Sequence, residues 1–161
     1  MHNFKRELYL KIIFIISCTA LVSAFFIEYA LGYQPCNLCL IERIPYGISI
    51  ILVITIFILK KNENFIIMLL ILTFIFSLAI SIYHFGIEHG FFQESSVCGT
   101  KDFNENITKE DLLELLSQER VSCKDVTFRI FGLSLTSINI VISLSLILTL
   151  TRIFTNYEKK R

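Results

Sequence analysis

The sequence predicts an all-α integral membrane protein, a four-helix bundle forming one domain over residues 1–161. The chain is strongly apolar, with 54% hydrophobic residues and a mean hydropathy of +0.66, well beyond an ordinary soluble domain. Its apolar residues gather into four runs of about 20 residues, the length that an α-helix needs to cross a bilayer. Four such spans leave no room for a separate soluble domain.

The first apolar run covers residues 12–31 and follows three basic residues. Basic residues before an apolar stretch are also typical of a signal peptide, and Val22-Ser23-Ala24 loosely resembles a cleavage site. The run stays apolar through residues 25–27, however, and is longer than a usual signal core. We therefore expect a retained helix, with a lipoprotein-type signal ending at Cys18 as a weaker alternative.

The second run, residues 40–59, starts at a Cys-x-x-Cys motif and stops at the polar segment 60–64. Pro45 falls within its first two turns, where a missing backbone donor is better tolerated than in mid-helix. The third run, residues 65–86, follows a loop so short that the two helices must be antiparallel neighbours. The two runs together predict a membrane hairpin.

A polar stretch, residues 87–129, separates the third run from the last one at residues 130–150. Thr108-Lys109-Glu110-Asp111 predicts the start of a short helix, with a capping hydroxyl and acids in its first turn. The leucines of residues 112–116 then share one side of that helix. We expect an amphipathic helix on the membrane surface or against the bundle, the alternative being a loop helix without membrane contact.

The charge pattern predicts the orientation. The N-terminus, the Lys60-Lys61 turn and the C-terminal tail are rich in lysine and arginine, and four spans place them on one side, which should be cytoplasmic. The loop from Glu88 to Arg129 carries nine acids and five bases. We therefore expect a multi-pass protein of a bacterial inner (cytoplasmic) membrane, with external loops 32–39 and 87–129 in the periplasm. The net charge of +1 says little about partners, and we expect no nucleic-acid partner.

Four of the five cysteines lie in the polar interruptions, namely Cys36, Cys39, Cys98 and Cys123. Only Cys18 lies within an apolar run. On the external side the four would occupy a compartment where disulfides form and persist. A cysteine at a helix N-terminus is more easily deprotonated because the helix dipole favours negative charge, so Cys39 is expected to be the better placed thiolate of its pair.

Arg43 follows Cys39 by one helical turn on the same face. It can stabilise a thiolate or a negatively charged acceptor, or its side chain can simply snorkel to lipid headgroups. Four cysteines could also bind zinc, but such sites usually pair two tight Cys-x-x-Cys elements or add histidines, whereas Cys98 and Cys123 are far apart. We expect no metal. Purely structural disulfides between the external loops, in a non-catalytic membrane protein, remain an alternative.

A redox relay also needs an electron acceptor. The sequence contains neither the Cys-x-x-Cys-His haem motif nor a dinucleotide fingerprint. The remaining acceptor at membrane depth is a lipid-soluble quinone, ubiquinone or menaquinone. It could bind between helices near the external surface, where Arg43 is expected.

Five elements follow one another in a specific order along these spans. They are Pro35-Cys36-Asn37-Leu38-Cys39 with Glu42-Arg43, Tyr83-His84-Phe85-Gly86-Ile87-Glu88, Cys98, Ser122-Cys123, and Phe131-Gly132-Leu133-Ser134-Leu135-Thr136. Over nearly the whole chain this order resembles the DsbB family of disulfide-bond-forming membrane proteins. It differs from the vitamin K epoxide reductase family, whose loop cysteines precede the Cys-x-x-Cys motif.

The resemblance implies an enzyme, a thiol:quinone oxidoreductase that reoxidises a soluble periplasmic DsbA-like thioredoxin-fold protein. Cys98 would form the mixed disulfide with that partner, and Cys123 would be its intramolecular mate. Cys36 and Cys39 would reoxidise that pair. Cys39 would then deliver the electrons to quinone.

The resemblance also implies two quinone-binding residues. Arg43 would support the thiolate–quinone state, and His84 matches a family histidine near the quinone, although a histidine at an aromatic helix end is as often simply interfacial. The chain departs from the family at Glu28, where many members carry a neutral polar residue. A carboxylate at membrane depth is costly unless it is paired or interfacial, so its role stays open. No tryptophan occurs, and Phe128 is expected to replace the aromatic residue after the second loop cysteine.

Overall fold

The structure is a computed structural model that describes residues 2–59, 62–94, 98, 122–124, 128–130 and 132–158. Its helices are α1 (His2–Tyr29), α2 (Asn37–Leu59), α3 (Glu63–Glu88) and α5 (Leu135–Glu158). Between α3 and α5, strand β1 (Arg129–Ile130) pairs antiparallel with β2 (Leu133–Ser134). The predicted all-α class is confirmed, with this small hairpin added. The amphipathic helix expected from Thr108 lies outside the described residues.

All four helices are long and apolar enough to span a membrane, which confirms a multi-pass membrane protein. Their ends differ from the predicted ones most at the start of α1 and at both ends of α5, which extends to Glu158 instead of about residue 150. The last helix begins at Leu135 instead of about residue 130, because the preceding residues form the hairpin, whose turn contains Gly132 at φ +84°. Glycine adopts this left-handed conformation readily, whereas a helix cannot continue through it. The first helix begins at His2 instead of about residue 12, so the helix extends through the basic residues before the apolar run.

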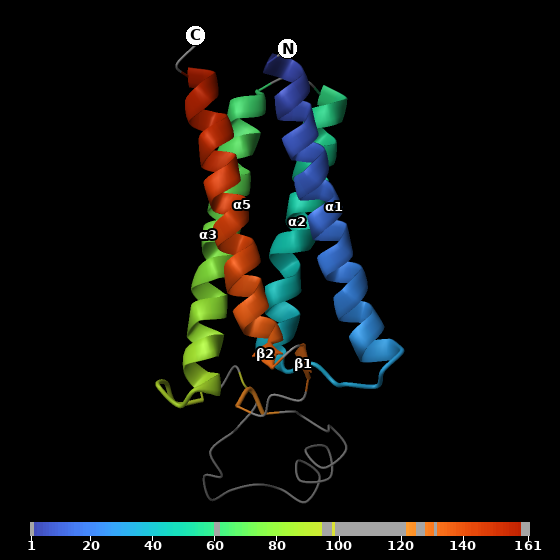
Figure 1. Cartoon of the computed structure of the whole chain (residues 1–161), viewed down its shortest axis with the longest axis vertical. Helices are drawn as coiled ribbons and strands as arrows, with labels where there is room; N and C mark the ends of the chain where they lie inside the picture. The colour runs from blue at the N-terminus through green and yellow to red at the C-terminus, as the bar shows by residue number, and fades with distance from the viewer. Residues whose placement is uncertain are drawn as a thin grey trace, which may run out of the picture.

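The helices run side by side with alternating direction, so the start of α1 and the end of α5 lie at the same end of the bundle (Figure 1). The α1–α2 connection, the β1–β2 hairpin and the start of α5 lie at the opposite end, here called the cysteine end. Helix α3 packs extensively against α5, and α2 packs against both α1 and α3, whereas α1 and α5 share few contacts. Among the helices that lie next to one another, α1 and α5 are therefore the most loosely packed pair.

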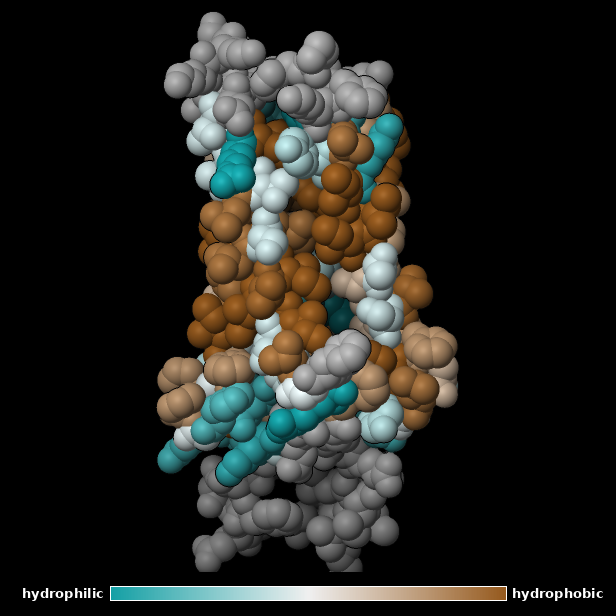
Figure 2. Space-filling model, in the orientation of Figure 1, coloured by the Kyte–Doolittle hydropathy of each residue, from teal (hydrophilic) through white to brown (hydrophobic). Residues whose placement is uncertain are grey.

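Apolar side chains fill the bundle interior away from the cysteine end. Leu10 and Ile13 of α1, Val53 of α2, Phe74 of α3 and Leu150 of α5 belong to one buried cluster. Many large apolar side chains lie exposed instead on the helix flanks. Figure 2 shows brown apolar residues across the middle of the face in view, with hydrophilic residues towards both ends. Such a band suits contact with lipid chains.

Small polar side chains join the helices inside the bundle. Ser17 of α1 and Ser49 of α2 lie with their hydroxyl oxygens 2.6 Å apart, and Ser77 of α3 and Ser143 of α5 are 3.1 Å apart. Lipid tails are as apolar as leucine, so close packing at small residues and interhelical hydrogen bonds stabilise helix contacts in a membrane. These pairs therefore hold the helices in the register that positions the cysteine end.

Candidate active site

Cys36 immediately precedes α2 and caps it. Its Sγ accepts a hydrogen bond from the backbone N–H of Cys39 at 3.2 Å, and its carbonyl oxygen accepts one from the N–H of Leu40 at 3.2 Å. The side chain thus occupies the position of an N-cap acceptor, where a helix favours negative charge. The sequence predicted this advantage for Cys39. In the structure, the backbone N–H at the start of α2 donates its hydrogen bond to the sulfur of Cys36 instead.

The two sulfur atoms of the motif lie 2.7 Å apart. Cys36 is buried, while Cys39 is partly exposed. Because a disulfide bond is about 2.05 Å long, only a small movement separates these thiols from a closed disulfide. The pair can therefore change between dithiol and disulfide with α2 in place.

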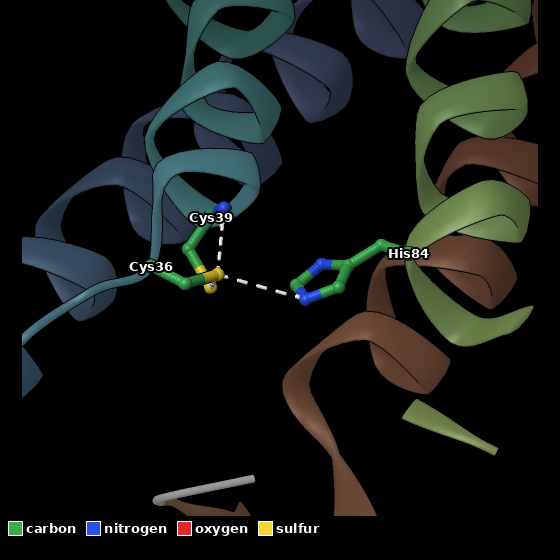
Figure 3. Close-up of side chains that lie close together, drawn as sticks. All are labelled: Cys36, Cys39 and His84. Carbon is green, nitrogen blue, oxygen red and sulfur yellow. Dashed lines mark hydrogen bonds between the residues drawn. The ribbon is translucent and has the colours of Figure 1, made fainter. Parts of the chain in front are cut away.

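His84 lies opposite this pair, near the end of α3, and points towards Cys36 (Figure 3). Its Nε2 is 3.6 Å from Cys36 Sγ, and its Nδ1 is 3.1 Å from Glu42 Oε1 and 3.2 Å from Thr136 Oγ1. The side chain is only 3% exposed. This histidine is therefore embedded between α2, α3 and α5, in contrast to the interfacial alternative.

Cys98 and Cys123 lie buried beside Cys36, in a cluster that includes Leu38 and Ile87. The Cys123 thiol forms hydrogen bonds with both Cys36 and Cys98. The hydrogen bond with Cys36 and then burial raise the pKa of the Cys123 thiol, and the bond with Cys98 opposes them only in part. Three of the four predicted cysteines thus meet in one buried cluster, and Cys39 packs against it.

Glu94 holds the turn that carries Cys123. Its Oε1 accepts hydrogen bonds from the Ser122 hydroxyl and from the backbone N–H of Lys124, the latter at 2.9 Å. The same oxygen thereby contacts the residues on both sides of the second loop cysteine. This contact ties the end of the long loop to the segment that follows α3.

Cys36, Cys39 and His84 also offer three ligand atoms within 4.8 Å of one another, a group that could hold a metal ion. Two thiolates bound tetrahedrally to zinc, at Zn–S distances of about 2.3 Å, would lie roughly 3.8 Å apart. The observed sulfur separation of 2.7 Å is much shorter. The side chains as they lie are thus arranged for S–S bonding, and the absence of a metal remains a prediction.

A cavity of about 190 Å³ adjoins the cysteines. Its apolar walls include Ala20, Ala24 and Ile27 of α1 and Leu135, Ile138 and Ile142 of α5. These are the two helices that barely touch, and Figure 2 shows a hollow between their surfaces on the face in view. A cavity of about 150 Å³ can hold a benzene molecule, so this one has room for a single substituted ring.

Cys36, Cys39, His84 and Cys123 line the inner part of this cavity, and so does Arg43. Arg43 forms an ion pair with Glu28 of α1, and its side chain is 15% exposed, against 21% for Glu28. Its guanidinium carbon also lies 5.1 Å from the centre of the Phe25 ring. Arg43 therefore faces α1 and the cavity, which disfavours the snorkelling alternative, and Glu28 is a paired carboxylate.

Phe128 closes the cavity at the cysteine end together with Tyr33, with ring centres 5.1 Å apart. Three further polar residues of the site, Glu42, Glu88 and Thr136, received no role from the sequence. Each nevertheless belongs to a motif quoted above. The signals that could have singled out the two glutamates are a carboxylate inside the second span, at Glu42, and the helical spacing of His84 and Glu88.

Comparison with known proteins agrees with this arrangement. The family model described as "Disulfide bond formation protein DsbB" matches residues 6–153. The chain is also 30% identical over 137 residues to "Uncharacterized protein RP370" of Rickettsia prowazekii (strain Madrid E), an alignment covering 84% of this chain and 80% of the relative. With four helices that can span a membrane and clustered loop cysteines, this chain belongs to the DsbB family of disulfide bond formation proteins.

Proposed function

We propose that this protein is a thiol:quinone oxidoreductase that reoxidises a soluble, DsbA-like thioredoxin-fold dithiol protein in the periplasm. One observation carries the proposal. The cavity between α1 and α5 has the Cys-x-x-Cys pair, Cys123 and Arg43 in its lining. Thiols that can exchange disulfides therefore share one cavity with the flank of the bundle that faces lipid.

The two cysteine pairs act in series in this proposal. A thiolate of the partner attacks the Cys98–Cys123 disulfide at Cys98, giving a mixed disulfide, and the partner's second thiol releases Cys98 and closes the partner's own disulfide. The two electrons and two protons then reside on Cys98 and Cys123 as thiols. The hydrogen bond between Cys123 and Cys36 supports direct exchange with the Cys36–Cys39 disulfide.

The Cys36–Cys39 dithiol is the last protein group that carries the two electrons before they reach the quinone. When bound, a quinone supplies an acceptor for two electrons and two protons. Arg43 and His84 are the residues proposed to hold it, because both line the cavity beside Cys39. The cationic Arg43 side chain favours negative charge in the cavity, the apolar walls exclude water, and the N-terminus of α2 donates a backbone hydrogen bond to Cys36 Sγ.

The orientation follows from the same scheme. A periplasmic partner requires the cysteine end on the periplasmic side, which puts both chain termini in the cytoplasm, in agreement with the charge pattern. A DsbA-type partner is strongly oxidising, at about −120 mV, so its reoxidation needs an acceptor that is at least as oxidising. A quinone in the membrane meets this need.

Quinone reduction by the purified protein tests the proposal. The protein in detergent is mixed with a reduced thioredoxin-fold dithiol protein and either a ubiquinone or a menaquinone analogue, and the quinone absorbance is followed. One quinone should be reduced per partner disulfide formed, Cys39→Ala should abolish the reaction, and Cys18→Ala, a matched change outside the cluster, should leave it intact. If neither quinone is reduced, the cysteines are structural, and the non-catalytic alternative takes its place.

A further inference from the structure

Glu88 is a buried carboxylate without a full set of partners. It is the last residue of α3, its side chain is 6% exposed, and it lines the cavity. Its Oε1 accepts a hydrogen bond from the Thr136 hydroxyl at 2.7 Å, whereas its buried Oε2 has no hydrogen-bond partner among the described residues. Burying a carboxylate oxygen without a partner is costly, and this oxygen can accept one further hydrogen.

The hydrogen bonds that connect Glu88 to His84 through Thr136 have a defined direction. Thr136 has a single hydroxyl hydrogen, and it donates this hydrogen to Glu88. Its oxygen, 3.2 Å from His84 Nδ1, must therefore accept a hydrogen from that nitrogen. Glu42 Oε1, the other partner of Nδ1 at 3.1 Å, is also an acceptor when ionised. A neutral His84 with these two contacts carries its proton on Nδ1.

This tautomer determines whether Nε2, the other ring nitrogen, donates or accepts a hydrogen bond. In neutral imidazole with a proton on Nδ1, Nε2 has a free lone pair. Nε2 lies 3.6 Å from Cys36 Sγ, so the Cys36 thiol is the donor towards it. A directed chain of hydrogen bonds therefore runs from the Cys36 thiol through His84 and Thr136 to Glu88.

We propose that Glu88 is the proton acceptor for the Cys36 thiol, reached through His84 and Thr136. The S–H bond of Cys36 breaks and its electron pair stays on sulfur. The proton passes to His84 Nε2, the Nδ1 proton passes to Thr136, and the Thr136 hydroxyl proton passes to Glu88. The net change is one thiol and one carboxylate converted to one thiolate and one carboxylic acid, and nothing is oxidised or reduced.

The relay deepens the proposed function and rests on it for its purpose, because disulfide exchange requires a thiolate. Several titratable groups surround the relay. They are Cys36, Cys39, Glu42, Arg43 and Tyr46 in or just before α2, His84 of α3, Cys98 and Cys123 of the loop segments, Tyr33 of the α1–α2 connection, and Glu28 of α1, the ion-pair partner of Arg43. Helix α5 contributes Thr136 but no titratable group to the cavity. Glu42 is thus the competing acceptor, and the experiment must separate it from Glu88.

The test measures the pH profile of Cys36 reactivity in the reduced, quinone-free, full-length protein. Iodoacetamide alkylates the thiols, and mass spectrometry quantifies the peptide that contains Cys36. Glu88→Gln keeps a hydrogen-bond acceptor for Thr136 but cannot take the proton, so the profile should move to higher pH by about one unit, a roughly tenfold loss of rate on its lower limb. Glu88→Asp should restore most of this loss. Glu7→Gln, a matched change on an exposed side chain far from the cysteine end, should have no effect.

A second variant keeps the proposal falsifiable if Glu88→Gln fails to fold. Thr136→Val retains both carboxylates but breaks the chain, and its profile should shift in the same direction. An unshifted profile in either folded variant overturns the proposal, as does a shift in Glu42→Gln alone. Neither quinone nor partner is present, so this result is independent of whether the protein reduces quinone.

Discussion

Glu28 of α1 and Arg43 of α2 form an ion pair at the wall of the cavity, with both side chains largely buried. An arginine that already has a carboxylate partner attracts a second anion less strongly, because the two compete for the same cation. The carboxylate of Glu28 therefore bears directly on Arg43. It is expected to weaken the interaction of Arg43 with the acceptor.

Glu28→Gln should strengthen quinone binding. Releasing Arg43 from an ion pair worth about 0.5–1 kcal/mol corresponds to a roughly two- to fivefold lower KM for quinone. The value of kcat should change less, since the thiols are untouched. Steady-state quinone reduction at saturating partner dithiol measures both constants, and an unchanged or higher KM would contradict the competition.

Arg43→Ala should weaken quinone use and leave exchange with the partner dithiol largely intact. The reason is that Arg43 lines the cavity, whereas the exchange takes place in the cysteine cluster. A loss of 1.4 kcal/mol would raise the KM for quinone by about tenfold. Single-turnover oxidation of the partner by quinone-free protein is the matched measurement. Slower exchange, or unaltered quinone kinetics, would show that Arg43 acts elsewhere.

The order of the spans could be predicted because it depends on local sequence, on apolar runs and short polar interruptions. The pairing of Cys36 with Cys39 could be predicted for the same reason, because it depends only on their spacing in the sequence. The contact of His84 with Cys36 could not be predicted, because it depends on which face of α3 packs against α2. The start of α5 was missed because the apolar residues before Leu135 are equally compatible with a hairpin, which Gly132 allows. The pairing of Glu28 with Arg43 likewise requires the packing of α1 on α2.

Cys123→Ala should trap the partner on Cys98. In this variant Cys98 is a free thiol that attacks the disulfide of the oxidised partner and frees one partner thiol. Cys123 is absent and cannot displace the partner from Cys98, so a mixed disulfide accumulates. Non-reducing electrophoresis should show a partner-linked band that reductant removes and that the additional change Cys98→Ala abolishes. Cys18→Ala supplies the matched cysteine control. A band that survives in the double variant would assign the first exchange to another cysteine.

Asn139→Ala should destabilise the bundle. Asn139 of α5 accepts a hydrogen bond from the Tyr46 hydroxyl and donates one to Ser81 Oγ at 2.7 Å, so it joins three helices. Truncation leaves two buried polar groups unpaired, at a cost of about 1–2 kcal/mol. Ser145→Ala, which removes only an exposed hydroxyl bonded within α5, should cost little. Denaturation followed by circular dichroism compares the two.

The pH profile of Cys123 should report its contact with Cys36. Because the hydrogen bond with Cys36 is the largest cause that raises the pKa of Cys123, its thiol stays neutral at pH 7 and becomes a thiolate only above its ordinary value of 9.0. Alkylation of Cys123 in the reduced protein should therefore be slow at neutral pH and rise only under alkaline conditions. In Cys36→Ala the rise should move to lower pH.

The same shift has a consequence for stability. A thiol whose pKa is raised by folding contributes stability that is complete below the unfolded value and is lost as the pH rises above it. The reduced protein should consequently lose stability above about pH 9, and Cys36→Ala should reduce the part of this loss that comes from Cys123. Thermal unfolding of both reduced proteins between pH 7 and about pH 10 provides the comparison. An identical pH dependence in the two would mean that the hydrogen bond between Cys36 and Cys123 does not govern the ionisation of Cys123.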